Sequence, residues 1–159
     1  MKRKIIKALL ASVCLLSSTN ISAHDITVKN TDGVSIYYNF TNDSTELTVT
    51  RRGSAYNCYS GNVVIPESVI YNGNTYSVTT IGEEAFFESS HLISVSIPNS
   101  VTTIGDHAFY LCSSLTLVTI PNSVTFIGDG AFGHCGSLAS VTIPNNVTFI
   151  GGGAFAYCI

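Results

Sequence analysis

Charged side chains are scarce in this sequence. Its 159 residues include 7 Lys or Arg and 10 Asp or Glu, and the net charge is −3. A protein that binds nucleic acid needs a basic patch or stripe to neutralise phosphates, and the sequence carries no such stripe. We therefore expect no nucleic acid among its partners, and we expect Ser, Thr and Asn to supply most of the polar surface.

Long hydrophobic runs are absent after the N-terminus, so no transmembrane segment is expected in the mature chain, because a span needs about 20 apolar residues. The one apolar run at the N-terminus, residues 5–16, is shorter than that. It follows Lys2, Arg3 and Lys4, and small residues ending at Ala23 come after it. This layout is typical of a secretory signal peptide, residues 1–23. We expect cleavage after Ala23, export, and a secreted or cell-surface location.

Disorder is excluded by the apolar residues, which make up 45% of the chain and recur in a fixed register. The period is 23 residues, since Ile97-Pro98-Asn99 returns at 120–122 and again at 143–145. Three other sets keep the same spacing: Gly82, Gly105, Gly128 and Gly151; Ala85, Ala108, Ala131 and Ala154; and Phe86, Phe109, Phe132 and Phe155. A fixed period in this range predicts a solenoid whose coils pack on their neighbours.

One coil, residues 115–137, illustrates the structure that the repeat predicts. Val118 and Ile120 point to the same side of a short strand, because side chains alternate along a strand. Gly128 follows at a corner, where we expect a positive φ. Residues 131–135 fit one inward-facing helical turn. The sequence therefore predicts an α/β solenoid of 23-residue coils, each with a short parallel strand and a short helical turn.

The residues before the regular coils predict β-structure. The β-branched and aromatic runs at 34–40 and 46–51 predict a hairpin, and 63–70 and 75–81 predict a second one through Asn72-Gly73-Asn74. We expect residues 24–68 to form an N-terminal β-hairpin cap on the first coil. About four coils then occupy residues 69–159, near 69–91, 92–114, 115–137 and 138–159, with the last one incomplete.

The repeat carries a family resemblance. Its pattern is Leu-x-x-Val-x-Ile-Pro-x-Ser-Val-x-x-Ile-Gly-x-x-Ala-Phe-x-x-Cys, found at 115–135 and, with small changes, at 92–112 and 138–158. This pattern resembles the BspA-type leucine-rich repeat, also called the Treponema pallidum type, of surface proteins in anaerobic bacteria and some protists. The resemblance implies a leucine-rich repeat solenoid that binds proteins or glycans of host or neighbouring cells, as an adhesin or interaction module.

Three cysteines lie one period apart, at Cys112, Cys135 and Cys158, with Cys58 outside this column. Export would place them in a compartment that permits disulfides. The spacing favours small buried thiols stacked coil upon coil, and a bridge between adjacent coils is the alternative.

Catalysis is not expected, although thiols and imidazoles are both present. Cys112 and Cys135 fall on the buried column, where a thiol is inert without an electropositive neighbour. His107 and His134 occupy different positions of the repeat, so the spacing does not build a nucleophile–base pair. We expect neither an enzyme nor a cofactor.

Acidic residues form a column of their own at Glu83, Asp106 and Asp129. At the start of each short helix, negative charge would be favoured by the helix dipole. We expect a solvated acidic strip, with weak Ca²⁺ binding as the alternative and no dedicated metal site.

Two outward columns are candidate binding faces. The first, on the strand before each proline, consists of Ser94, Ser96, Leu117, Thr119, Ser140 and Thr142. The second consists of Thr125, Phe126, Thr148 and Phe149, beside Thr102 and Thr103. Exposed apolar side chains often mark contact sites, and the alternative for the two phenylalanines is that they tuck against a corner.

The fourth coil stops one residue short of a full period and lacks a polar cap. A bare last coil leaves apolar side chains and a strand edge open. Either further coils follow in the natural chain, or this edge docks on another chain, including a second copy. The sequence is also compatible with a structural or spacer segment of a larger exported protein.

Overall fold

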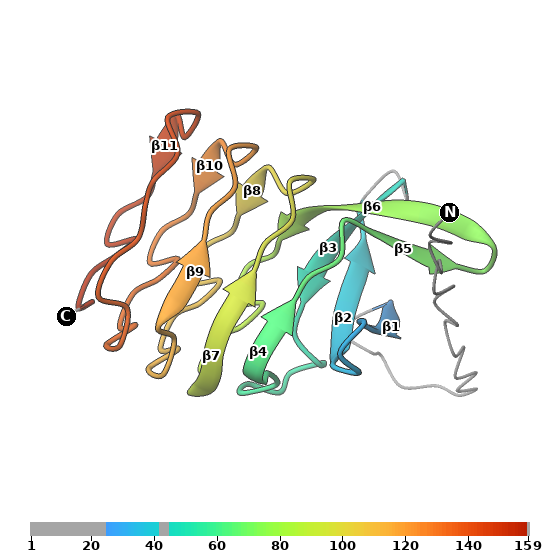
Figure 1. Ribbon diagram of the computed structural model, residues 1–159, viewed down its shortest axis with the longest axis horizontal. Coiled ribbons are helices and arrows are strands. Elements are labelled where there is room, and N and C mark those ends of the chain that lie inside the picture. The colour runs from blue at the N-terminus through green and yellow to red at the C-terminus, as the bar shows by residue number, and fades with distance from the viewer. Residues whose placement is uncertain (1–24, 42–44, 159) are drawn as a thin grey trace, which may run out of the picture.

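The computed structural model describes residues 25–41 and 45–158, which form a leucine-rich-repeat β-solenoid of about four turns (Figure 1). The predicted signal peptide, residues 1–23, lies outside the described residues. In chain order the strands are β1 (Ile26–Lys29), β2 (Ser35–Phe40), β3 (Glu46–Thr50), β4 (Ser60–Val64), β5 (Ser68–Tyr71), β6 (Asn74–Ile81), β7 (His91–Ser96), β8 (Thr103–Ile104), β9 (Leu117–Thr119), β10 (Phe126–Ile127) and β11 (Phe149–Ile150).

The strands form two sheets. One has three parallel strands in the order β4–β7–β9, and the other has eight, running β1–β2–β3–β6–β8–β10–β11 with β5 paired to β6. Successive coils pair one period apart, so that Val95 lies opposite Val118 and Ile104 opposite Ile127. Identical positions of the repeat are therefore stacked on one another along the solenoid, as Figure 1 shows for β8, β10 and β11.

Antiparallel strands occupy the N-terminal part. β2 pairs with β3 and β5 with β6, at the places where the two hairpins were predicted, and β1 adds a further antiparallel strand to β2. β3 then pairs in parallel with β6, which joins this part to the coils in one sheet. In this N-terminal part, inward side chains such as Ile36 and Leu47 are fully buried. That residues 24–68 act as a cap on the first coil stays a prediction.

The predicted helical turns are wrong, because the described residues contain no helix. In residues 82–89 alternate N–H groups donate in two directions. Those of Glu84, Phe86 and Glu88 donate to carbonyls of the next coil, and those of Ala85, Phe87 and Ser89 donate to the carbonyl three residues back. Half of these N–H donors are thus used between coils, so the i to i−4 hydrogen-bond ladder of a helix cannot form.

Within residues 25–41 and 45–158, the structure has no helix long and apolar enough to cross a membrane.

The glycine column also differs from its prediction. Gly82, Gly105 and Gly128 do not have positive φ; that conformation falls two residues later, at Glu84, His107 and Gly130. The glycines are needed for close approach instead. A Cβ on Gly105 would lie 2.8 Å from the backbone nitrogen of Glu83, in the preceding coil. A side chain at these positions would therefore push adjacent coils apart.

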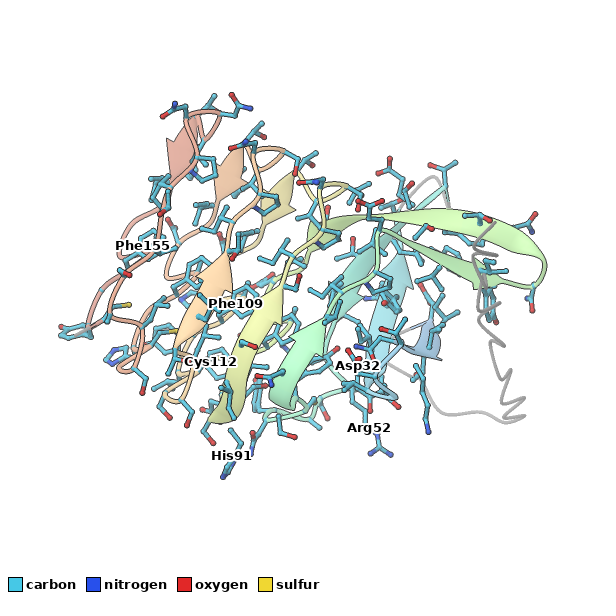
Figure 2. All side chains as sticks on the ribbon, in the orientation of Figure 1. Asp32, Arg52, His91, Phe109, Cys112 and Phe155 are labelled. Carbon is cyan, nitrogen blue, oxygen red and sulfur yellow. The ribbon has the colours of Figure 1, made fainter. Side chains whose placement is uncertain are left out.

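A column of phenylalanine rings forms the centre of the core. Phe86, Phe109 and Phe132 have no exposed surface, and their ring centroids are 4.8 and 5.0 Å apart in nearly parallel planes. Phe155 continues the column at 5.2 Å from Phe132. Tyr59 extends it toward the N-terminal part, 4.3 Å from Phe86. Figure 2 shows Phe109 between the strands, inside the solenoid.

We expect Phe109→Ala to lower the free energy of unfolding by about 3–5 kcal/mol, because it removes a fully buried ring between two others. Urea denaturation followed by circular dichroism would measure the change. Phe149→Ala is the matched control, since the Phe149 ring is 48% exposed, and we expect it to cost about 1 kcal/mol or less. Equal losses in the two variants would contradict the assignment of the core.

Candidate functional site

The first candidate surface lies on the three-stranded sheet, and we call it the strand face. On β7 and β9 the side chains of Val95 and Val118 point inward and are buried. Ser96 and Thr119, which lie opposite each other, are exposed on the outer side. Ser94 lies opposite Leu117, whose side chain is 61% exposed. The register therefore brings these four predicted residues together.

The remaining two predicted residues continue the strand face into the fourth coil. Ser140 and Thr142 are both exposed. Within the described chain, no strand is assigned to residues 139–144. The strand face thus has a parallel ladder through β9 and ends in a segment without an assigned strand.

β4 extends the strand face on its other side, which the sequence analysis did not include. Asn62 lies opposite Ser94, and its side-chain oxygen accepts a hydrogen bond of 2.8 Å from the Ser94 hydroxyl. Val64 lies opposite Ser96 and is 41% exposed. The sequence analysis predicted one strand over residues 63–70, in a hairpin with 75–81. The structure divides this run between β4, which pairs with β7, and β5, which pairs with β6.

An exposed isoleucine was also missed. The pairing of β4 with β7 shifts register, so that Gly61 faces Leu92 and Asn62 faces Ser94, which leaves Ile93 without an opposite residue. The Ile93 side chain is 47% exposed as a result. The three-residue spacing between Leu92 and Val95 is the sequence signal that could have indicated this bulge. The strand face therefore presents three aliphatic side chains among small hydroxyl side chains.

The second candidate surface, Thr125, Phe126, Thr148 and Phe149, lies on the eight-stranded sheet, so the structure does not bring it together with the strand face. The Phe126 and Phe149 rings stack with centroids 4.7 Å apart. Phe149 is 48% exposed, and Phe126 is half-buried. The Thr148 hydroxyl donates a 3.1 Å hydrogen bond to the Thr125 carbonyl of the preceding coil. This threonine column therefore also links the coils to one another.

The cysteine column consists of free thiols that hydrogen-bond between coils. Cys112 donates to the Phe86 carbonyl at 3.0 Å, and Cys135 donates to the Phe109 carbonyl at 3.1 Å. Burial raises the pKa of the Cys135 thiol to about 12 and also raises the pKa of Cys112. A thiol that is both buried and protonated is a poor nucleophile.

The acidic residues Glu83, Asp106 and Asp129 are exposed, as expected for a solvated strip, but no helix starts at them. The Asp106 carboxylate accepts a 2.9 Å hydrogen bond from the N–H of Asp129, and the Asp129 carboxylate accepts one of 2.6 Å from Gly152. Both aspartates thus accept a hydrogen bond from the backbone of the next coil. Among residues 25–41 and 45–158, no group of three or more His, Cys, Asp or Glu side chains is placed to hold a metal ion.

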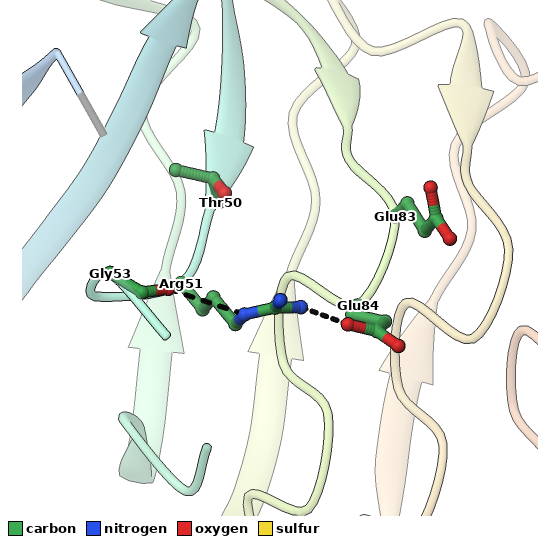
Figure 3. Close-up of a pocket in the computed structure, with 5 residues that line it drawn as sticks. All are labelled: Thr50, Arg51, Gly53, Glu83 and Glu84. Atoms are coloured by element: carbon green, nitrogen blue, oxygen red, sulfur yellow. Dashed lines mark hydrogen bonds and ion pairs between the residues drawn. The ribbon is translucent and has the colours of Figure 1, made fainter. Parts of the chain in front are cut away.

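A small hollow at the end of β3 is lined by Thr50, Arg51, Gly53, Glu83 and Glu84 (Figure 3). The Arg51 guanidinium spans it, since it donates to the Gly53 carbonyl at 3.3 Å and forms an ion pair with Glu84. The same guanidinium lies 5.0 Å from the centre of the Tyr56 ring. Arg51 is therefore engaged in a contact between the N-terminal part and the first coil.

Residues 56–159 match the family model of the BspA type leucine rich repeat region, in six copies. No curated protein matches the chain. Several solved bacterial structures are similar to it. A leucine-rich repeat protein from Bacteroides ovatus is 36% identical, covers 77% of this chain and 32% of its own, and superposes with a TM-score of 0.70. The chain thus spans about a third of that relative's length.

Two further structures have slightly lower sequence identity to this chain. The Treponema pallidum leucine-rich repeat protein is 29% identical over 77% of this chain and 64% of its own, with a TM-score of 0.58. A leucine rich cell surface protein from Faecalibacterium prausnitzii is 30% identical over 90% of this chain and 42% of its own, with a TM-score of 0.56.

The thiols supply a test of the buried column. In the folded protein at about pH 8 we expect iodoacetamide to leave Cys112 and Cys135 unmodified and to label the half-buried Cys58, because only thiolates react. Mass spectrometry of digests, with a urea-unfolded sample as the control, would measure the labelling. Rapid labelling of Cys135 in the folded state would contradict the assignment and would restore a thiol nucleophile as a hypothesis.

The same burial gives the protein a defined response to alkali. Folding favours the protonated Cys135 thiol, because burial raises its pKa from 9.0 to about 12. The contribution of this thiol to the free energy of unfolding is therefore fully present below pH 9.0 and is lost as the pH rises through about 12.

Proposed function

The chain belongs to the BspA-type leucine-rich repeat family, and from this premise we propose that it is an exported, non-catalytic protein-binding module, secreted or held at the cell surface. Leucine-rich repeats of this family are generally non-catalytic. The relative from Faecalibacterium prausnitzii is described as a cell surface protein, which supports the proposed location.

The strand face is the observation that carries the proposal. Its small serine and threonine side chains make it flat, and it presents Val64, Ile93 and Leu117 in partly or largely exposed positions. Exposed aliphatic side chains within a polar surface are typical of protein contact sites. The strand-face residues named above carry no charge, so binding would depend on shape and apolar contact more than on long-range attraction.

Adhesion is the form of binding that we propose. The partners would be proteins or glycans of host or neighbouring cells, and binding would bring two surfaces together without chemical change. Phe149 and Ile150 on β11 are each 48% exposed, and this supports a secondary proposal of self-association through the last coil.

A second candidate function is that of a spacer in a larger exported protein. It is favoured by the comparison with Bacteroides ovatus, in which this chain corresponds to 32% of the relative's length. A spacer would hold another domain away from the cell and would need no ligand on the strand face.

Two charges on the strand face should separate these functions. We expect Leu117→Asp combined with Thr119→Asp to weaken binding to a panel of immobilised extracellular-matrix proteins by about tenfold or more, because a buried, unpaired carboxylate is costly at an interface. Surface plasmon resonance would measure the affinities. Thr75→Asp, at an exposed threonine of the other sheet, is the matched control and should bind like the wild type.

Unchanged binding by the strand-face variant would contradict the assignment of that surface. The absence of binding to every matrix protein, for the wild type as well, would favour the spacer.

Export has a test of its own. We expect the native protein, recovered from the envelope or the medium of its source, to begin at His24, because a signal peptidase cleaves after small residues such as Ala23. Intact-mass spectrometry with N-terminal sequencing would measure this. A protein that keeps Met1 and is recovered from the cytoplasm would contradict export.

A further inference from the structure

A second hollow, of about 410 Å³, lies on the turn segments that follow β8, β10 and β11. Its lining includes four rings, those of His107, Tyr110, His134 and Tyr157, together with Gly130, Gly152 and Gly153. We call it the aromatic groove. It is open to solvent over much of its extent. It uses none of the strand-face residues.

The aromatic groove exists because the repeat is broken there. His107 and Tyr110 of the second coil correspond to Gly130 and Gly133 of the third. A Cβ on Gly130 would lie 2.8 Å from the His107 ring, and a Cβ on Gly133 would lie 2.9 Å from the Tyr110 ring. The two rings therefore lie against bare backbone of the next coil, and larger residues at those two positions would displace them.

The other wall comes from a different column of the repeat. His134 and Tyr157 correspond to Leu111 of the second coil and Glu88 of the first. Between the second and third coils, aromatic residues are thus lost at the positions of His107 and Tyr110 and gained at the position of Leu111. The result is a continuous series of rings beside the backbone of Gly130, Gly152 and Gly153.

The rings are held in place by one another and by the backbone. The His134 and Tyr157 rings stack at 4.4 Å, and the His134 ring meets the Tyr110 ring edge to face at 5.1 Å. His107 and Tyr110 make a similar edge contact at 5.2 Å. The N–H of His134 donates to the Ala156 carbonyl at 2.8 Å, which fixes its positive φ of 59°. Pre-organised rings lose little entropy when a ligand binds.

The chemistry of the walls selects one kind of ligand. Each ring offers an apolar face together with a polar atom, either a tyrosine hydroxyl or an imidazole nitrogen. The one formally charged side chain in the lining is Asp129. One of its carboxylate oxygens accepts the bond from Gly152, and the other can accept from a ligand hydroxyl. A neutral ligand with an apolar face and hydroxyls along its edges would satisfy all of these groups, whereas the Asp129 charge disfavours an anion.

The geometry points to a binding site for a neutral oligosaccharide in the aromatic groove. A pyranose ring presents a C–H face that packs on an aromatic ring, and its equatorial hydroxyls lie at the rim, where imidazole, phenol and carboxylate groups can pair with them. Tyr157 lines the aromatic groove beside His134, and its hydroxyl lies on a side chain that is 73% exposed. The aromatic groove and the strand face are separate surfaces, so one molecule could hold a glycan and a protein at once.

Tetrasaccharides of glucose and of N-acetylglucosamine, in α and β linkage, would serve as probes. We expect at least one of them to bind the mature protein, as measured by saturation-transfer NMR and by titration of tyrosine fluorescence. Tyr157→Ala should weaken this binding about tenfold, because it removes a stacking ring. Tyr157→Phe keeps the ring and should stay within about threefold of the wild type. His134→Ala should weaken binding in the same direction as Tyr157→Ala.

Controls keep this site distinct from the proposed protein-binding surface. The combined Leu117→Asp and Thr119→Asp variant should bind the oligosaccharide like the wild type, and thermal unfolding would show that Tyr157→Ala remains folded. Failure of all probes to bind would overturn the site. Equal affinity in Tyr157→Ala and the wild type would overturn it as well. Loss of matrix-protein binding, with unchanged oligosaccharide binding, in Tyr157→Ala would identify a protein site in its place.

Discussion

Hydrogen bonding between backbones one repeat apart is the constraint on which the rest of this structure depends. It fixes Val95 opposite Val118 and Phe126 opposite Phe149, so that each side chain packs against its counterpart in the next coil. Four kinds of contact between coils follow from that register. They are ring stacking in the core, hydrogen bonds from the cysteine thiols to carbonyls, hydrogen bonds from the threonine hydroxyls to carbonyls, and hydrogen bonds from backbone N–H groups to the aspartate carboxylates. No coil completes these contacts by itself, and stability therefore belongs to the stack.

The repeat period was enough to predict the solenoid and the residues on each side of its strands. Strand alternation placed Ser96 and Thr119 outward and Val95 and Val118 inward, and the structure agrees. This worked because a period-2 pattern has one physical interpretation when it is repeated in register. The pairing of β2 with β3 could be predicted for a similar reason, since local alternation of side chains and a turn signal together define a hairpin.

The absence of helical turns and the role of the glycines could not be predicted from the sequence in this way. Inward residues at Ala131, Phe132 and Cys135 fit one face of a helix and equally fit a series of tight turns, and the choice depends on donors in another coil. Gly105 likewise has a purely non-local reason, the approach of the preceding backbone. The bulge at Ile93 arises in the pairing with β4, a strand outside the regular coils. The aromatic groove depends on differences between coils, which a search for similarity does not examine.

Those differences bear on how the chain reaches its native pairing. Coils that are nearly identical could dock one period out of register, and such misassembly is a characteristic failure of repeat proteins. The exchange of His107 and Tyr110 for Gly130 and Gly133 makes neighbouring coils unequal, because those two rings fit over the glycines of the third coil. The glycines of the third coil thus favour docking of the second coil in the native register over docking one period away.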